Sequence, residues 1–155
     1  MQCPCHPQHL FADCCAPYLE QGVEPPTPLA LMRARYSAFV LGHEAFLLHT
    51  WHPATRGELT VAELTQSSKN TQWLGLTILF AQGHADDLQG TVEFKVRYKE
   101  HTKVHLLHER SHFERVAGFW KYHSGQHNPP KIKINALCPC LSGKKYKLCC
   151  AKRFT

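Results

Sequence analysis

The sequence has no long apolar run. Its longest apolar stretches lie around Phe46–Leu48 and Leu74–Phe80. Both are far shorter than the roughly 20 residues that a membrane-spanning helix needs. The chain also begins without the basic start and apolar stretch of a secretory signal. We therefore expect a soluble, cytoplasmic protein.

Cysteine is absent from the whole middle of the chain. The eight cysteines are Cys3, Cys5, Cys14, Cys15, Cys138, Cys140, Cys149 and Cys150. An even number permits disulfides, but the cytosol keeps thiols reduced, and adjacent cysteines such as Cys14 and Cys15 pair poorly for geometric reasons. Four cysteines at each end indicate two separate sites.

Acidic residues are absent from one end of the chain and basic residues from the other. Residues 128–155 hold seven Lys or Arg and no Asp or Glu, whereas residues 1–27 hold no Lys or Arg. The intervening residues are nearly balanced in charge, so the net charge of +6 comes from the C-terminal segment. A local basic surface of this kind indicates an acidic partner.

The two cysteine segments form an internal repeat. Each reads Cys-Pro-Cys, eight residues, then Cys-Cys. That spacing lets the chain loop back and surround one ion tetrahedrally with four thiolates, and such a closed shell is structural because it leaves no open position. We expect Zn²⁺ at both ends; thiolates also accept iron, and a thiol redox role is the remaining alternative.

The central segment begins with helical signals. Thr27 can cap a helix that starts at Pro28, and Gly42 can end it. A second helix is predicted near residues 44–50, before Pro53. The capping-box spacing of Thr60 and Glu63 predicts a third over about 61–67.

From Gln72 the period of the apolar residues changes to two. Strands are predicted over 72–80, 91–99, 104–116 and 119–124, with a tight turn at Ala117-Gly118. Helices followed by an antiparallel meander predict an α+β domain with one helical layer. We divide the chain into residues 1–24, a central domain at 25–127, and a linker with the second cysteine segment at 128–155.

Residues 138–150 resemble the SEC-C motif, which also closes the preprotein translocase ATPase SecA. The segment Cys-Pro-Cys-Leu-Ser-Gly-Lys-Lys-Tyr-Lys-Leu-Cys-Cys departs from that motif only at Leu141, where Gly is usual. If the Gly needs a positive φ, Leu141 will strain the turn. The N-terminal copy keeps its cysteines and Pro4 but lacks the Gly-Ser-Gly loop and the lysines. We interpret that copy as a staple for the end of the domain.

The whole chain resembles the YchJ family, which has a SEC-C motif at each end. The matching stretches are Leu31–Val40, Thr50–Pro53, Trp73–Leu76, Glu109–Phe113 and Trp120–Tyr122. The resemblance implies a cone-shaped domain like that of nuclear transport factor two, with helices packed into a curved antiparallel sheet. No reaction is implied.

A cone of this kind often holds a pocket. Its predicted polar and aromatic neighbours are Arg33, Arg35, Tyr36, Trp51, His52, Trp73, and one of Glu109 and Arg110, which point to opposite faces of a regular strand. His52 is the best candidate base, without an evident carboxylate partner. The alternative is a packed core containing an Arg–Glu pair. His105, His108 and His112 are spread too far along one strand to favour a metal site.

The basic segment gives the first functional hypothesis. The candidate partner-binding residues are Lys144, Lys145, Tyr146, Lys147, Lys152 and Arg153. They predict a binding or adaptor protein that docks an acidic protein such as an export chaperone, the ribosome, or an anionic lipid surface, with no specific DNA binding. The alternatives are a merely solvated charged surface, and an enzyme or small-ligand-binding protein that uses the central pocket.

Overall fold

The computed structural model describes residues 1–155 as an α+β domain flanked by two small cysteine segments. Its elements follow in this order: β1 (Gln2–Cys3), β2 (His6–Leu10), the 3₁₀ helix η1 (Phe11–Asp13), α1 (Ala16–Glu20), α2 (Pro28–Leu41), α3 (Glu44–His49), α4 (Pro53–Arg56), α5 (Val61–Ser68), β3 (Thr71–Gln82), β4 (Gln89–Glu100), β5 (Lys103–Val116), β6 (Phe119–His127), the 3₁₀ helix η2 (Tyr146–Leu148) and α6 (Cys150–Arg153). The predicted fold class is confirmed.

Helix α2 begins and ends where its local sequence dictates. The Thr27 hydroxyl accepts a hydrogen bond from the Ala30 amide at 3.1 Å, with Pro28 in the first turn. Gly42 ends the helix in the left-handed conformation, with φ of 76°. In α5, Thr60 and Glu63 form the predicted reciprocal capping box.

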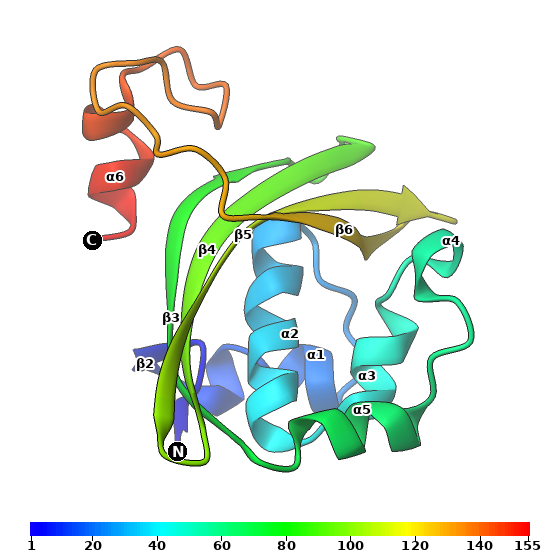
Figure 1. The fold of residues 1–155 in the computed structure, drawn as a ribbon. Helices are drawn as coiled ribbons and strands as arrows, with labels where there is room; N and C mark the ends of the chain where they lie inside the picture. The colour runs from blue at the N-terminus through cyan, green and yellow to red at the C-terminus, as the bar shows by residue number, and fades with distance from the viewer.

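The sheet is a four-stranded antiparallel meander in the order β3-β4-β5-β6. Ala117 and Gly118 connect β5 to β6, and both have the positive φ that the predicted tight turn needs. Figure 1 shows the sheet curving around α2, with α3, α4 and α5 at its open side. The apolar face of β4 and the helices thus enclose a single main core, which includes Leu31, Phe94 and Trp120.

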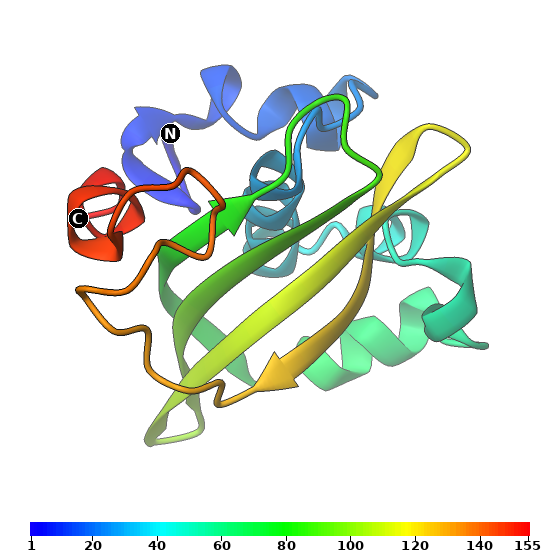
Figure 2. The same cartoon turned by 90° about the horizontal axis from the view of Figure 1, so that it is seen from above.

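Both cysteine segments lie at the β3 side of the sheet. Figure 2 shows the two chain ends next to each other, and residues of both segments, Cys5 and Arg153 among them, line one surface pocket. None of the helices combines the length and the apolar character that a membrane-spanning segment requires.

Three features of the fold escaped the sequence analysis. The short helix α4 begins at Pro53, which we had placed beyond a helix end. Helix α1 and the β1–β2 pair lie inside the N-terminal cysteine segment. These elements are too short to show a clear hydrophobic period.

Candidate metal centres, basic surface and cavity

The structure brings the eight cysteines together as two clusters of four. In each cluster, all four sulfur atoms lie within 4.8 Å of one another. The Cys5 sulfur lies 3.5 Å from each of Cys3, Cys14 and Cys15, and Cys140 lies 3.4 Å from Cys149. A tetrahedral zinc site with bonds of about 2.3 Å needs sulfur atoms about 3.8 Å apart, whereas a disulfide needs about 2.05 Å. The clusters therefore have metal-site dimensions, and every cysteine is free.

The internal repeat is structural as well as sequential. A 3₁₀ turn precedes the second cysteine pair in both copies, and the amides of Cys14 and Cys149 donate to the carbonyls of Phe11 and Tyr146. Phe11 and Tyr146 occupy the same place in the repeat, and both are buried. In each cluster, the second cysteine pair thus follows a turn that begins with a buried aromatic residue.

Four thiols this close cannot all ionise without a cation. The hydrogen bond to Cys15, together with burial, raises the pKa of Cys5 far above its usual range, and the same bond lowers the pKa of Cys15 to about 6. Burial also raises the pKa of Cys150. A divalent ion supplies the missing positive charge and makes four thiolates compatible. The donor set is all sulfur, which suits zinc and also iron.

The N-terminal cluster is built into the main core. Cys3, Cys5 and Cys15 are buried there beside Phe11 and Ala16. The Ser37 hydroxyl, on α2, donates to the Cys15 sulfur at 3.3 Å. This geometry fits the staple that we inferred from the altered loop of this copy.

The C-terminal cluster lies on the outside of the sheet. Its Cys138, Tyr146 and Cys150 pack against Phe80 of β3 in a small separate cluster. The Tyr146 hydroxyl donates to the Leu79 carbonyl at 2.9 Å. We call residues 134–155 the C-terminal knuckle; Tyr146 fixes it to β3.

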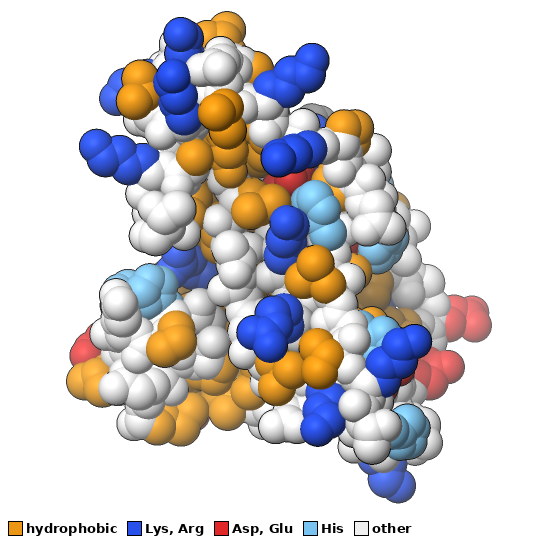
Figure 3. Space-filling view, turned by 60° about the vertical axis from the view of Figure 1, so that its left-hand side comes forward, with side chains coloured by type: hydrophobic (Ala, Val, Ile, Leu, Met, Phe, Trp, Pro, Cys, Tyr) orange, Lys and Arg blue, Asp and Glu red, His pale blue; other side chains and the backbone are white.

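Most of the predicted partner-binding residues form an exposed surface. Lys144, Lys145, Lys147, Lys152 and Arg153 are exposed, and none lies within 4.0 Å of a carboxylate. Figure 3 shows Lys and Arg side chains over the C-terminal knuckle, at the top of the view, among apolar ones. Tyr146 is the exception: it is buried, so it positions the knuckle and cannot stack on a partner.

The apolar part of this surface was not anticipated. Ile134, Leu137, Leu141 and Leu148 are between 56% and 79% exposed. Exposed apolar side chains that gather in one patch with a polar rim mark interaction surfaces. We call the exposed lysines, Arg153 and these four residues together the knuckle surface.

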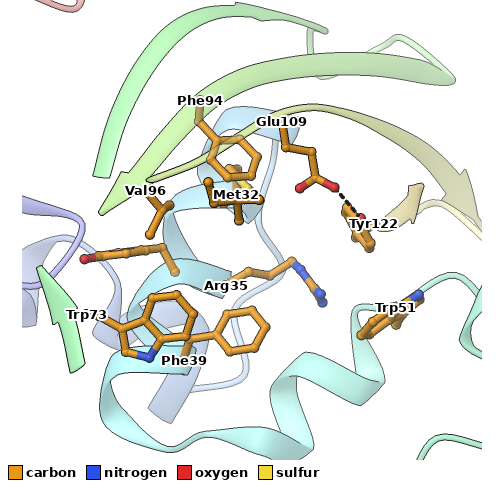
Figure 4. A pocket seen from close by; sticks show the side chains of 11 residues that line it. Met32, Arg35, Phe39, Trp51, Trp73, Phe94, Val96, Glu109 and Tyr122 are labelled. Carbon is orange, nitrogen blue, oxygen red and sulfur yellow. Dashed lines mark hydrogen bonds between the residues drawn. The ribbon is translucent and has the colours of Figure 1, made fainter. Parts of the chain in front are cut away.

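A cavity of about 160 Å³ lies between the sheet and the helices. It is lined by Met32, Arg35, Tyr36, Phe39, Trp51, Trp73, Phe94, Val96, Leu107, Glu109 and Tyr122. Four of the predicted pocket residues, Arg35, Tyr36, Trp51 and Trp73, are among them, and Glu109 is the member of its pair that enters (Figure 4).

Three predicted pocket residues lie elsewhere. Arg110 is on the outer face, where it pairs with Glu93 at 2.8 Å. Arg33 faces the pocket between the two cysteine segments. His52 caps α4, because its Nδ1 accepts a hydrogen bond from the Ala54 amide at 3.0 Å. The cavity does not reach His52.

His52 nevertheless has the carboxylate partner that the sequence did not reveal. Its Nε2 lies 3.3 Å from Glu114, and His123 completes a group whose ligand atoms lie within 4.8 Å of one another. Since Nδ1 accepts from Ala54, the proton of the neutral ring is on Nε2. That nitrogen lies beside Glu114 and, carrying the proton, has no lone pair for a metal, so we interpret the group as a surface cluster of polar side chains.

The cavity residues that the sequence analysis missed are mostly apolar, apart from Tyr122. Phe94 and Val96 belong to the buried face that the alternation in β4 had indicated. The Tyr122 hydroxyl donates to Glu109 at 3.0 Å. The sequence signal that could have identified Tyr122 as a cavity residue is its position on the inner face of β6.

Two family models match the chain. Residues 27–125 match the model described as YchJ, middle NTF2-like domain, and residues 135–152 match the SEC-C motif. The N-terminal cysteine segment lies outside both matches.

Curated relatives extend over nearly the full length. The UPF0225 protein SG1365 of Sodalis glossinidius is 41% identical over 150 residues, which is 96% of each chain. The UPF0225 protein PC1_1977 of Pectobacterium carotovorum is 40% identical over 153 residues, or 97% of each.

Two solved structures share the fold. The solution structure of RPA3114, a SEC-C motif containing protein from Rhodopseudomonas palustris, has a TM-score of 0.73 and 29% identity, covering 81% of this chain and 98% of that one. The crystal structure of a SEC-C motif containing protein from Psychrobacter arcticus has a TM-score of 0.70 and 28% identity, covering 98% and 96%.

Proposed function

Because this chain belongs to the YchJ family, with an NTF2-like middle domain and a SEC-C motif, we propose that it is a cytoplasmic zinc-binding adaptor. In this proposal the C-terminal knuckle docks an acidic partner, and the N-terminal cluster is structural. The observation that carries it is the knuckle surface: five basic side chains without a carboxylate partner, presented by a fold built around four clustered cysteines.

Zinc is the metal that we propose for both clusters. Four thiolates form a closed tetrahedral shell, and no open position remains for water or substrate. Elemental analysis of protein purified without added metal should find about two zinc ions per chain. Iron in comparable amount would contradict zinc, and metal-free protein with free thiols would contradict metal binding altogether.

Charge and rigidity together support docking. The knuckle surface needs no local unfolding to bind, since Tyr146 and Phe80 fix its base to β3. Its lysines have no carboxylate within 4.0 Å to displace, so a partner's negative charge meets unpaired cations. Preorganised unpaired charge raises association rates and makes binding sensitive to salt.

The ribosome is the acidic partner that we propose to test first. Its RNA presents dense phosphate charge, and neutralising phosphates with lysines releases counterions. Binding should therefore weaken steeply between low and moderate salt. Acidic proteins, such as an export chaperone, and anionic vesicles are the other arms of the test, because the exposed leucines would suit those surfaces too.

The experiment is co-sedimentation of the full chain with purified ribosomes at low and high salt. The triple variant Lys144→Glu, Lys145→Glu, Lys147→Glu should lose binding. The matched control reverses Lys69, Lys99 and Lys103, which lie near the start of β3, at the opposite end of that strand from Phe80, and change the net charge equally. The control should retain binding.

Three outcomes would contradict the proposal for the ribosome. These are binding that survives the knuckle substitutions, equal loss of binding in both triple variants, and a wild type that does not sediment with ribosomes at low salt. Binding in the acidic-protein or vesicle arm alone, with the same dependence on the three lysines, would keep the docking surface and replace the partner.

A further inference from the structure

The cavity inside the cone contains one charged group that the protein leaves partly unpaired. Apart from Arg35 and Glu109, its lining consists of apolar and aromatic side chains. An engineered apolar cavity of about 150 Å³ is large enough to admit benzene. The volume of about 160 Å³ here therefore fits a ligand with a single-ring body.

Arg35 is held with one edge of its guanidinium free. Its Nη1 donates to the Leu47 carbonyl at 2.8 Å and to the Thr50 hydroxyl at 2.7 Å. Its Cζ lies 4.8 Å from the centre of the Tyr122 ring and 5.4 Å from that of Trp51. The Nε and Nη2 atoms donate to no protein group. Figure 4 shows the side chain reaching from α2 into the space between these two rings.

The charge of Arg35 has no ion-pair partner in the protein. The side chain is buried, and no carboxylate oxygen lies within 4.0 Å of it. Burial lowers the pKa of Arg35 to about 10, so the group is still cationic at neutral pH. A buried cation without an anion is costly, and a strongly perturbed group that faces a cavity is a candidate for ligand binding.

Glu109 does not fill this role. Its carboxylate accepts from the Tyr122 hydroxyl at 3.0 Å and from the Ser111 hydroxyl at 3.1 Å. Gly125 lies so close to it that an added methyl group would overlap the carboxylate. These contacts hold Glu109 on the sheet, away from a direct pair with Arg35.

The geometry points to a binding site for a small carboxylic acid with an apolar, ring-sized body. The free Nε and Nη2 edge of Arg35 is the edge that pairs with a carboxylate through two parallel hydrogen bonds. The aromatic and aliphatic lining takes the body of the ligand. The Glu109 carboxylate already accepts from two hydroxyls, and on its own it would favour a cationic ligand, so the order of benzoate over benzamidine tests whether Arg35 sets the charge preference. This site is independent of the docking proposal, because it shares no residue with the knuckle surface.

The test compares three ligands that differ in charge but hardly in shape: benzoate, benzamide and benzamidine. Binding is followed by the indole NH signals of Trp51 and Trp73, which line the cavity. Trp120, whose indole donates to Pro26 outside the cavity, is the internal control. Benzoate should shift the first two signals saturably, with a Kd of about 0.1–1 mM. Benzamide should bind at least about 10-fold more weakly, and benzamidine weakest.

Two variants separate the anchor from the cavity. Arg35→Lys keeps the charge but loses the paired edge, so benzoate should bind about 10- to 100-fold more weakly. Leu107→Phe leaves Arg35 unchanged but fills the cavity, and should abolish binding. Arg33→Lys, on the same helix but outside the cavity, should bind benzoate as the wild type does.

The proposal is overturned if none of the three ligands shifts the indole signals at about 10 mM. It is overturned equally if benzamidine binds best, or if Arg35→Lys binds benzoate as the wild type does. None of these results depends on ribosome binding, so this site and the docking surface fail or succeed separately.

Discussion

The Ser37 hydroxyl donates a hydrogen bond to the Cys15 sulfur at 3.3 Å, and both residues are buried. Ser37 lies on α2, the helix that also carries Arg35. The N-terminal cluster is therefore tied to the element that forms one wall of the cavity. The C-terminal cluster has its own serine contact, between Ser142 and Cys149 at 3.1 Å, but that contact is exposed.

Ser37→Ala should loosen the metal at the N-terminal site. A hydrogen bond to a thiolate stabilises its charge, and a bond of this kind is worth about 1 kcal/mol. Chelator-driven metal release should become about 3- to 10-fold faster for one of the two ions. Ser142→Ala is the matched control and should affect only the other ion, and less strongly because of its exposure. Unchanged release from Ser37→Ala would show that the contact does not stabilise the site.

The two clusters should differ in their contribution to the central domain. Cys14→Ser and Cys149→Ser remove corresponding ligands, and each should reduce the metal content from about two ions to one. Cys14→Ser should also destabilise the whole domain by on the order of 4 kcal/mol, because its neighbours Cys3, Cys5 and Cys15 are in the main core.

Cys149→Ser should leave the main unfolding transition nearly unchanged, since the C-terminal knuckle packs on the outer side of β3. Thermal unfolding followed by near-ultraviolet circular dichroism measures both variants. Equal shifts for the two would contradict the division into a structural staple and an external knuckle.

Leu141 has the strained backbone conformation that we predicted because it stands where the SEC-C motif usually has Gly. Its φ is 68°, in the left-handed region that side chains with a Cβ disfavour. Leu141→Gly should stabilise the knuckle by about 1 kcal/mol, measured as tighter metal binding at the C-terminal site. Gly143 has φ of 82° with free space around it, so Gly143→Ala is the reciprocal control and should weaken the site by a similar amount. If Leu141→Gly weakens the site, the side chain contributes more than the strain costs.

Local signals in the sequence were sufficient to predict the helix ends, the inner face of the sheet and the two cysteine clusters. Thr27, Gly42 and Thr60 act at the helix ends as their chemistry requires, and alternation in β4 gives the inner face of the sheet. The cysteine spacing gives both clusters without knowledge of the fold, because all ligands of each lie within a short segment.

The cavity could be predicted only in part, because its polar contacts come from distant segments. Arg33 and Arg35 are two residues apart on α2 and so point in different directions, but the sequence does not say which one faces inward. The inward orientation of Arg35 is decided by its hydrogen bonds to the Leu47 carbonyl and the Thr50 hydroxyl, which belong to the next helix, α3, and its C-cap. His52 and Glu114 meet for the same kind of reason, since α4 packs against β6, which pairs with β5, the strand that carries Glu114.

Glu114 should titrate below its ordinary pKa of 4.5. The main cause is the hydrogen bond from His112, whose Nε2 lies 3.1 Å from the carboxylate; His123 and His52 add to the effect, and partial burial opposes it. A carboxyl whose pKa is lowered by folding stabilises the folded state above its unfolded pKa. That contribution is lost as the pH falls through the lower, folded value.

The measurement is a carbon-13 NMR titration of the Glu114 carboxyl within the pH range over which the protein stays folded. At pH 4.5, more than half of this carboxyl should remain ionised. His112→Ala should move the midpoint upward, whereas His49→Ala, which removes a histidine whose nearest carboxylate is Glu24, should not. A midpoint at or above 4.5 in the wild type would mean that the histidines do not favour the charged form. A midpoint unmoved by His112→Ala would assign the shift to His123 and His52, because these are the other groups that lower it.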